Sequence, residues 1–259
     1  MKRPIPASTR FATSIWPSLA LAALVFGAWG CAGRERAAVA HVGPQIQSMD
    51  GTVALASLAD GRRRAPADRR DDPSVRERLR EAEAGTYIAE ILESRDSNVA
   101  RWPNREGRPL RVWVQPATHL DGWDPAYVGI VQGAFTEWAS VGIPVPFQFS
   151  TDSARSDIHV TWRERFNEPI SGKTRWARDD GWWIIEGSIT LALHHHQGDP
   201  LGASAVKAIA LHEVGHLLGL DHTADIANIM TPRVRVRELS AADRATLRLI
   251  YTLPAGAVR

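Results

Sequence analysis

Residues 211–222 (LHEVGHLLGLDH) constrain the fold of this chain more than any other part of its sequence. His212 and His216 are four residues apart, so on a helix both imidazoles project from one face. Gly219 follows where a helix can end in a left-handed conformation, which glycine adopts at little cost. The reversal of the chain at that glycine brings His222 back toward the same face. These residues therefore predict a helix, a sharp turn and three histidines around one point.

Three neutral imidazoles around one point can hold a divalent ion, and nitrogen ligands suit zinc. Three protein ligands leave a fourth position for water, as in catalytic rather than structural zinc sites. Glu213 adjoins the first histidine and is placed to reach that water rather than the metal. Zinc lowers the pKa of a bound water from about 15.7 to about 7, so a neighbouring carboxylate can take the proton. We therefore expect one catalytic Zn2+, with His212, His216 and His222 as ligands and Glu213 as general base.

The motif and the residues after it resemble the metzincin metallopeptidases, and among them the matrixins. The pattern HExxHxxGxxH of that family is matched without a gap. Met230 stands eight residues after His222, at the spacing of the matrixin Met-turn, and Pro232 fits the same turn. The resemblance implies that Gly219, Met230 and Pro232 support the metal site. It covers about residues 108–259 and implies a zinc endopeptidase that acts on proteins or peptides.

The expected fold class is α+β (mixed α/β): a metzincin-like twisted sheet with an active-site helix, a Met-turn and a C-terminal helix. Strands are expected over 110–114, 147–149 and 158–162, with a hairpin of 182–185 and 188–193 that turns at 186–187. Helices are expected over 125–140, capped by Asp124, over 203–218, and from Leu239, where Ser240 and Asp243 have capping-box spacing.

In metzincins an edge strand just before the active-site helix pairs with the extended backbone of the substrate, a form of strand addition. The resemblance assigns this cleft role to one segment, against the alternative of a merely structural strand. Its residues are Ser188, Ile189, Thr190, Leu191, Ala192 and Leu193.

Residues 1–31 predict a signal peptide. Basic residues precede an apolar run of about 14 residues, 15–28, which is too short for a transmembrane helix of about 20 residues. Cys31, the single cysteine of the chain, follows in a context that resembles the lipobox of bacterial lipoproteins. The alternative is ordinary cleavage nearby and a free secreted protein. We expect an exported protein, either a cell-envelope lipoprotein or secreted, with membrane contact only through a lipid anchor or the signal peptide.

Residues 32–105 are expected to form a polar linker followed by an amphipathic helix. The stretch 60–72 carries charges of both signs and is broken by glycine and proline, as in a solvated linker. Apolar residues then recur at helical spacing over 73–94. This segment is a candidate pro-segment, and residues 106–259 are expected to form the metallopeptidase catalytic domain.

The overall composition excludes several classes of function. The chain has 259 residues, of which 44% are hydrophobic, and 31 Lys and Arg stand against 29 Asp and Glu. This near balance gives no basic footprint for nucleic acid, so we expect no nucleic-acid partner. The resemblance implies a protein or peptide substrate, and we expect a monomer. Two alternatives to an endopeptidase stay open: a non-catalytic envelope lipoprotein stapled by zinc, and a zinc hydrolase that acts on a cell-wall amide.

Two further metal sites are hypotheses, each with a structural alternative. His194, His195 and His196 could join His159 around a second Zn2+, or form a polar loop before the active-site helix. The segment 179–181 (DDG) could contribute to a Ca2+ site, although two adjacent carboxylates supply few of the 6–8 oxygens that calcium takes.

Overall fold

The computed structural model describes residues 45–48, 53–55, 73–82 and 84–258. The expected signal peptide and Cys31 lie outside these residues. The strands are β1 (Gln45–Ser48), β2 (Val53–Leu55), β3 (Asn98–Val99), β4 (Leu110–Val114), β5 (Phe147–Phe149), β6 (Ile158–Arg163), β7 (Gly172–Arg178), β8 (Ile184–Ala192) and β9 (Gly256–Ala257). The helices are α1 (Pro73–Ala82), α2 (Ile88–Ser94), α3 (Ala126–Ala139), the 3-10 helix η1 (Ser153–Arg155), α4 (Ala203–Leu217) and α5 (Ala241–Thr252). No helix in the described part of the chain combines the length and apolar character needed to cross a membrane.

A mixed sheet forms the centre of the fold. Within the described residues its seven strands run in the order β2-β1-β7-β8-β6-β4-β5. The neighbours among β8, β6, β4 and β5 are parallel, whereas β7 runs antiparallel to β8. In β4, Leu110, Val112 and Val114 are buried and the residues between them are more exposed, as their alternation predicts. The expected α+β fold class is confirmed.

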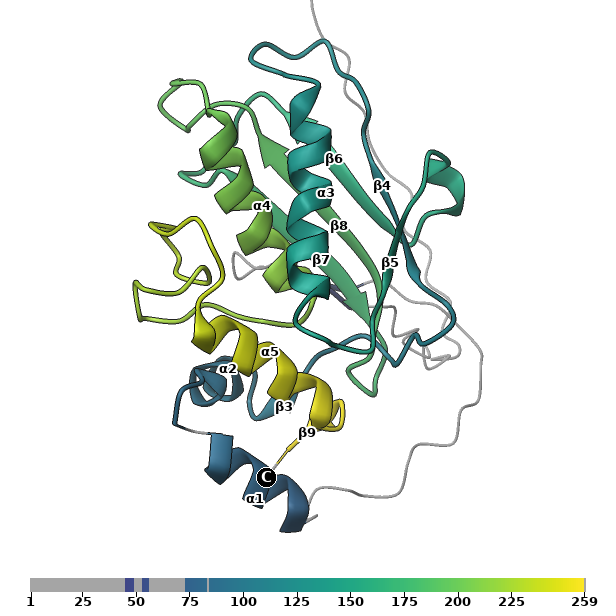
Figure 1. Ribbon diagram of the computed structural model, residues 1–259, viewed down its shortest axis with the longest axis vertical. Helices are drawn as coiled ribbons and strands as arrows, with labels where there is room; N and C mark the ends of the chain where they lie inside the picture. The colour runs from purple at the N-terminus through teal and green to yellow at the C-terminus, as the bar shows by residue number, and fades with distance from the viewer. Residues whose placement is uncertain (1–44, 49–52, 56–72, 83, 259) are drawn as a thin grey trace, which may run out of the picture. The chain divides into compact units, whose positions relative to one another are not determined.

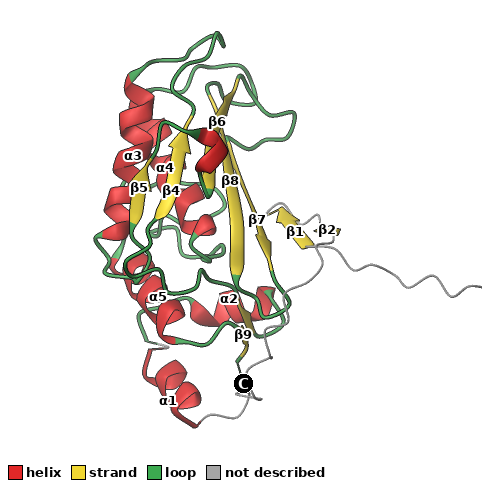
Figure 2. Cartoon of the chain, turned by 90° about the vertical axis from the view of Figure 1, so that its right-hand side faces the viewer, coloured by secondary structure: helices red, strands yellow, loops and turns green. Residues whose placement is uncertain are grey.

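Two helices, α3 and α4, lie side by side on one face of this sheet (Figures 1 and 2). Phe135 of α3 is fully buried and meets Phe147 of β5 edge-on, with ring centroids 5.1 Å apart. Trp138 donates its indole N–H to the Leu211 carbonyl at 2.8 Å, which fixes α3 against α4. The Asp124 carboxylate accepts from the Ala126 N–H at 2.8 Å, as expected of a cap.

A second group of elements, α2, α5 and the β3–β9 pair, gathers beyond the C-terminal end of α4 (Figure 1). The predicted capping box opens α5: Ser240 accepts from the Asp243 N–H, and the Asp243 carboxylate accepts from the Ser240 N–H. The expected single helix over 73–94 is wrong in one respect, because the chain breaks it into α1 and α2. Gly85 lies at the break with a φ of +91°, outside helical geometry.

The predicted hairpin of 182–185 and 188–193 is also wrong. Residues 184–192 form one continuous strand, β8, whose antiparallel partner is β7, and β7 was not expected from the sequence. Gly187 looked like a turn residue, but it lies within β8, where a Cβ would collide with the Leu217 side chain of α4. The glycine therefore allows the active-site helix to approach the sheet. The turn lies at 179–183, where Asp179 Oδ1 accepts from the Gly181 and Trp183 N–H groups.

The edge position expected for 188–193 is also wrong, because this segment belongs largely to β8. β8 lies between β7 and β6, so both of its sides are already paired within the sheet. A substrate strand cannot add to an interior strand, because such a strand has no edge to offer.

Candidate active site

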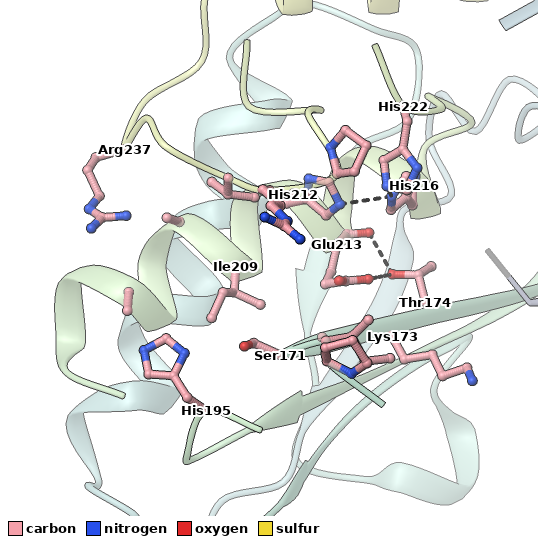
Figure 3. Close-up of a pocket in the computed structure, with 18 residues that line it drawn as sticks. Ser171, Lys173, Thr174, His195, Ile209, His212, Glu213, His216, His222 and Arg237 are labelled. Carbon is pink, nitrogen blue, oxygen red and sulfur yellow. Dashed lines mark hydrogen bonds between the residues drawn. The ribbon is translucent and has the colours of Figure 1, made fainter. Parts of the chain in front are cut away.

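Three histidines converge at the C-terminal end of α4 (Figure 3). His212 and His216 belong to α4, and His222 belongs to the loop that follows. His216 Nε2 lies 3.0 Å from His212 Nε2 and 3.2 Å from His222 Nε2. Two nitrogens bound to one tetrahedral zinc at about 2.0–2.1 Å are about 3.3 Å apart. The separations of the three imidazoles therefore fit a single zinc ion.

Backbone carbonyls fix which nitrogen of each helical histidine carries its proton. His212 Nδ1 lies 2.8 Å from the Ile229 carbonyl, and His216 Nδ1 lies 3.2 Å from the Leu220 carbonyl. A carbonyl only accepts, so each Nδ1 bears the hydrogen and each Nε2 keeps a free lone pair. Two such nitrogens cannot hydrogen-bond to each other, and their closeness suits a shared cation instead. This pattern of support is common around metal-binding histidines.

Burial keeps these imidazoles neutral. It lowers the pKa of His212 to about 4, and it lowers the pKa of His216 well below its usual value, with a further lowering from the neighbouring histidines. Burial also lowers the pKa of His222, against a raising effect of Asp221. Neutral imidazoles have the lone pairs that a metal ion needs.

The turn after α4 follows the geometry that the glycine in the motif predicts. Gly219 has a φ of +101°, and its N–H and that of Leu220 donate to the His216 and Gly215 carbonyls, both at 3.0 Å. A Cβ at position 219 would also collide with the Ala100 carbonyl oxygen. Both the dihedral angle and the close approach of another chain segment therefore favour glycine here.

Glu213 is buried next to the histidines, between α4 and β7. The Thr174 hydroxyl donates to its carboxylate, with Oγ1 2.5 Å from Oε2, as Figure 3 shows. A Cβ at Gly172 would collide with the same carboxylate, so the start of β7 leaves room for it. Burial raises the pKa of Glu213 to about 7, and the hydrogen bond from Thr174 opposes that shift.

Met230 is fully buried, and its Sδ lies against Gly215 of α4, next to His216 in the chain. The Thr223 N–H donates to its carbonyl at 3.1 Å. The preceding Ile229 N–H donates to Asp243 Oδ2 at 2.9 Å, so the cap of α5 also holds this turn. Ile229 is the residue whose carbonyl orients His212, and α5 therefore supports the site through it. Pro232 lines the cavity in front of the histidines.

Comparison with known proteins decides the family. A sequence model of the matrixin family matches residues 123–252, half of the chain, and includes every residue of the converging site. The chain belongs to the matrixin family.

Curated relatives of this matrixin include several plant proteins. It is 24% identical to Metalloendoproteinase 1 of Glycine max over 149 residues, which cover 49% of this chain and 46% of the relative. It is 28% identical to Metalloendoproteinase 5-MMP of Arabidopsis thaliana over 175 residues, which cover 58% of this chain and 45% of the relative. The match thus spans less than half the length of these relatives.

A cavity of about 560 Å³ opens in front of the three histidines of this matrixin. Its walls are α4, the segment 169–174 that leads into β7, and the segment after Met230. None of the six residues expected to form the cleft, 188–193, lines this cavity in the described part of the chain. The pairing of β1 with β7 covers only 175–178, so the cavity wall formed by 172–174 lies beyond the end of β1.

The histidines expected around a second zinc point to separate partners. His159 Nε2 lies 2.8 Å from the Ser153 carbonyl, and His196 Nδ1 lies 3.2 Å from the Phe166 carbonyl. His194 lies 3.5 Å from the Asp121 carboxylate, and His195 lines the cavity. Among the described residues, only the three histidines of the motif converge as a group of three or more potential metal-binding side chains.

The expected Ca2+ segment has a structural role. Asp179 Oδ1 accepts from two backbone N–H groups, both at 2.9 Å, in the turn between β7 and β8. That carboxylate oxygen is therefore engaged by the turn itself.

Proposed function

We propose that this matrixin is a zinc-dependent endopeptidase that hydrolyses peptide bonds. The observation that carries the proposal is the placement of a buried carboxylate, Glu213, against the same cavity as three converging imidazole nitrogens. His212, His216 and His222 would hold the zinc ion, and Gly219, Met230 and Pro232 would support them. A structural zinc site has no need of a carboxylate beside an open position, and this favours catalysis over a stapling role.

The residues of the chain suggest how the proton moves. A bound zinc ion would supply Lewis acidity toward the substrate carbonyl and would acidify a water. Glu213 accepts the proton of the attacking water and later donates it to the leaving amine. Because Thr174 donates to Oε2, we assign the transferred proton to Oε1. The burial that raises the pKa of Glu213 suits a group that must both take and release a proton.

The edge of β7 is the strand that we propose for the substrate backbone. Residues 172–174, the first part of β7, line the cavity next to Glu213. The edge that we mean is the one on the side opposite to β8. An extended peptide could add there by main-chain hydrogen bonds, which bind many sequences alike. This assignment replaces the one for 188–193.

Export as a lipoprotein or a free secreted protein stays a prediction from residues 1–31. The second zinc and the calcium remain hypotheses without support from the geometry above.

A side-by-side product analysis separates the proposal from its two alternatives. The purified protein is incubated with an unstructured protein and with peptidoglycan, each with and without a zinc chelator. We expect cleavage of internal peptide bonds that the chelator abolishes. Release of cell-wall amide products alone would favour the other hydrolase, and no product from either substrate would favour the zinc-stapled lipoprotein.

A further inference from the structure

The end of α4 and the loop that carries the third histidine are held by side chains from a segment 115 to 125 residues earlier in the chain. Trp102 donates its indole N–H to the Leu217 carbonyl at 2.9 Å. Arg95 donates to the Gly219 carbonyl at 2.7 Å and to the Leu220 carbonyl at 3.1 Å. The last carbonyls of a helix lack partners within the helix, and a cation near them is favourable.

Arg95 is tied to both neighbouring histidines through the atoms that it contacts. The Leu220 carbonyl that accepts from Arg95 lies 3.2 Å from His216 Nδ1. Arg95 Nε lies 3.3 Å from Asp221 Oδ2, and Asp221 Oδ1 accepts from the His222 N–H at 2.8 Å. One guanidinium therefore contacts three consecutive residues between the second and third histidines.

The other side of His222 is held from α2, the helix that Arg95 directly follows. Glu90 Oε1 accepts from the Thr223 hydroxyl at 2.9 Å, and Oε2 accepts from the Ala224 N–H at 2.7 Å. Ser94 donates to Asp221 Oδ2 at 2.9 Å. The loop is thus fixed immediately before and immediately after His222 by residues 90–95.

The Arg95 side chain is buried, so its charge must be compensated by its surroundings. Its side chain is only 1% exposed, whereas Asp221 retains 16% exposure. A buried charge is costly unless hydrogen bonds and an opposite charge compensate it. The two hydrogen bonds and the ion pair of Arg95 all go to the histidine loop, and the guanidinium also lies over the Trp176 ring of β7, 5.6 Å from the centroid. The loop and the guanidinium therefore depend on each other.

We propose that Arg95 is a positioning residue, which fixes residues 219–221 so that His216 and His222 keep their Nε2 atoms converged on the metal. It follows that α2 is a retained part of the catalytic unit and not of a removable pro-segment. The inference rests on the proposed zinc site, but it does not require that the protein cleave peptides.

The test is the zinc affinity of Arg95→Met in the full chain, measured by competition with a chromogenic chelator after zinc removal. We expect affinity to fall about 10- to 100-fold, as is typical when an outer partner of a metal ligand is lost. Arg95→Lys keeps the charge but not the fork of donors, and we expect an intermediate affinity. The visible absorption of bound Co2+ should change in both variants, because the geometry of the three imidazoles changes.

Arg101→Met is the matched control. Arg101 comes from the same segment and also donates to backbone carbonyls, at 2.9 Å to Leu253 and 3.3 Å to Trp102, but not to residues 219–224. We expect this variant to lose stability while its zinc affinity and Co2+ spectrum stay as in the wild type. Equal zinc affinity in Arg95→Met and the wild type would overturn the proposal and leave Arg95 a purely structural residue.

Two further comparisons cover a variant that does not fold and a protein that binds zinc without cleaving peptides. If Arg95→Met does not fold, Arg95→Lys and Asp221→Asn are measured instead, and unchanged zinc affinity in both would equally overturn the proposal. If the wild type binds zinc but cleaves no peptide, the endopeptidase proposal fails while the affinity comparison still tests Arg95.

Discussion

Met230 Sδ lies directly against Gly215 of the active-site helix, so closely that a Cβ at position 215 would collide with it. The glycine of the HExxH motif therefore leaves space for the methionine against the active-site helix. Close packing of this kind does not tolerate even one added methyl group without movement.

Gly215→Ala is predicted to destabilise the protein by about 1–3 kcal/mol, because the added methyl group overpacks a fully buried contact. Gly133→Ala in α3 is the control, since a Cβ there meets nothing within 4 Å. That substitution should stabilise by about 0.5–1 kcal/mol through the helix propensity of alanine. Urea unfolding of both variants checks the pair, and equal effects would contradict the contact described here.

Thr174→Val is predicted to shift the acid limb of the pH–activity profile to higher pH. The Thr174 hydroxyl favours the charged form of Glu213 and so lowers its pKa, while burial raises it. Without the hydroxyl the pKa of Glu213 rises further, so the ionised base is available only at higher pH. Thr161→Val is the control, because Thr161 bonds to Thr190 away from the cavity. An unshifted acid limb in Thr174→Val would show that the Thr174 hydroxyl does not influence the protonation of Glu213 during catalysis.

The charge of the cavity wall predicts a preference for acidic peptides. Arg233 and Arg237 line the cavity, and Figure 3 labels Arg237 among the lining residues. Glu213 is the only carboxylate among the described lining residues. We expect a higher kcat/KM for peptides with Asp or Glu near the cleaved bond than for matched peptides with Lys, and a smaller difference at high salt.

Arg237→Glu should reduce or reverse that preference, with Arg235→Glu as the control. Arg235 is exposed in the same segment but does not line the cavity. An equal effect of both substitutions would mean that overall charge, and not the cavity wall, sets the preference.

The contacts of α2 and of Tyr87 before it predict how much of the N-terminal segment can be removed by proteolysis. Tyr87 donates its hydroxyl to Asp243 at 3.0 Å, and its N–H donates to the Thr246 hydroxyl at 3.1 Å, so the chain is fastened from this residue onward. The mature protein should begin before Tyr87. Mass spectrometry of the exported protein measures its first residue, and a mature N-terminus near residue 105 would be incompatible with these contacts.

The sequence was most informative where one local rule decides the structure. The spacing of the histidines, the glycine at the end of α4 and the capping box of α5 each depend on neighbours within about one or two helical turns. The fold class followed from the order of the expected strands and helices and from the resemblance that the motif carries.

The sequence was misleading where the residue type at a position is explained by a contact with a distant part of the chain. Gly187 looks like a turn residue, but Leu217 explains it, 30 positions later. In β7 the buried residues are the polar Thr174 and the adjacent pair Trp176 and Ala177, so no clean apolar–polar alternation marks the strand. The neighbouring segment was therefore placed at the edge instead. Nothing near Arg95 marks it as a partner of residues 219–221, because only the folded chain brings α2 to that loop.

Glu213→Gln tests the central claim most directly, because the amide keeps the shape of the carboxylate but cannot take a proton. Zinc content and hydrolysis of a quenched peptide are measured on the same preparations of the variant and the wild type. We predict one zinc per chain in both proteins and a fall in kcat/KM of about 10²–10⁴-fold in the variant. Wild-type hydrolysis by Glu213→Gln with zinc still bound would contradict the assignment of Glu213 as the base.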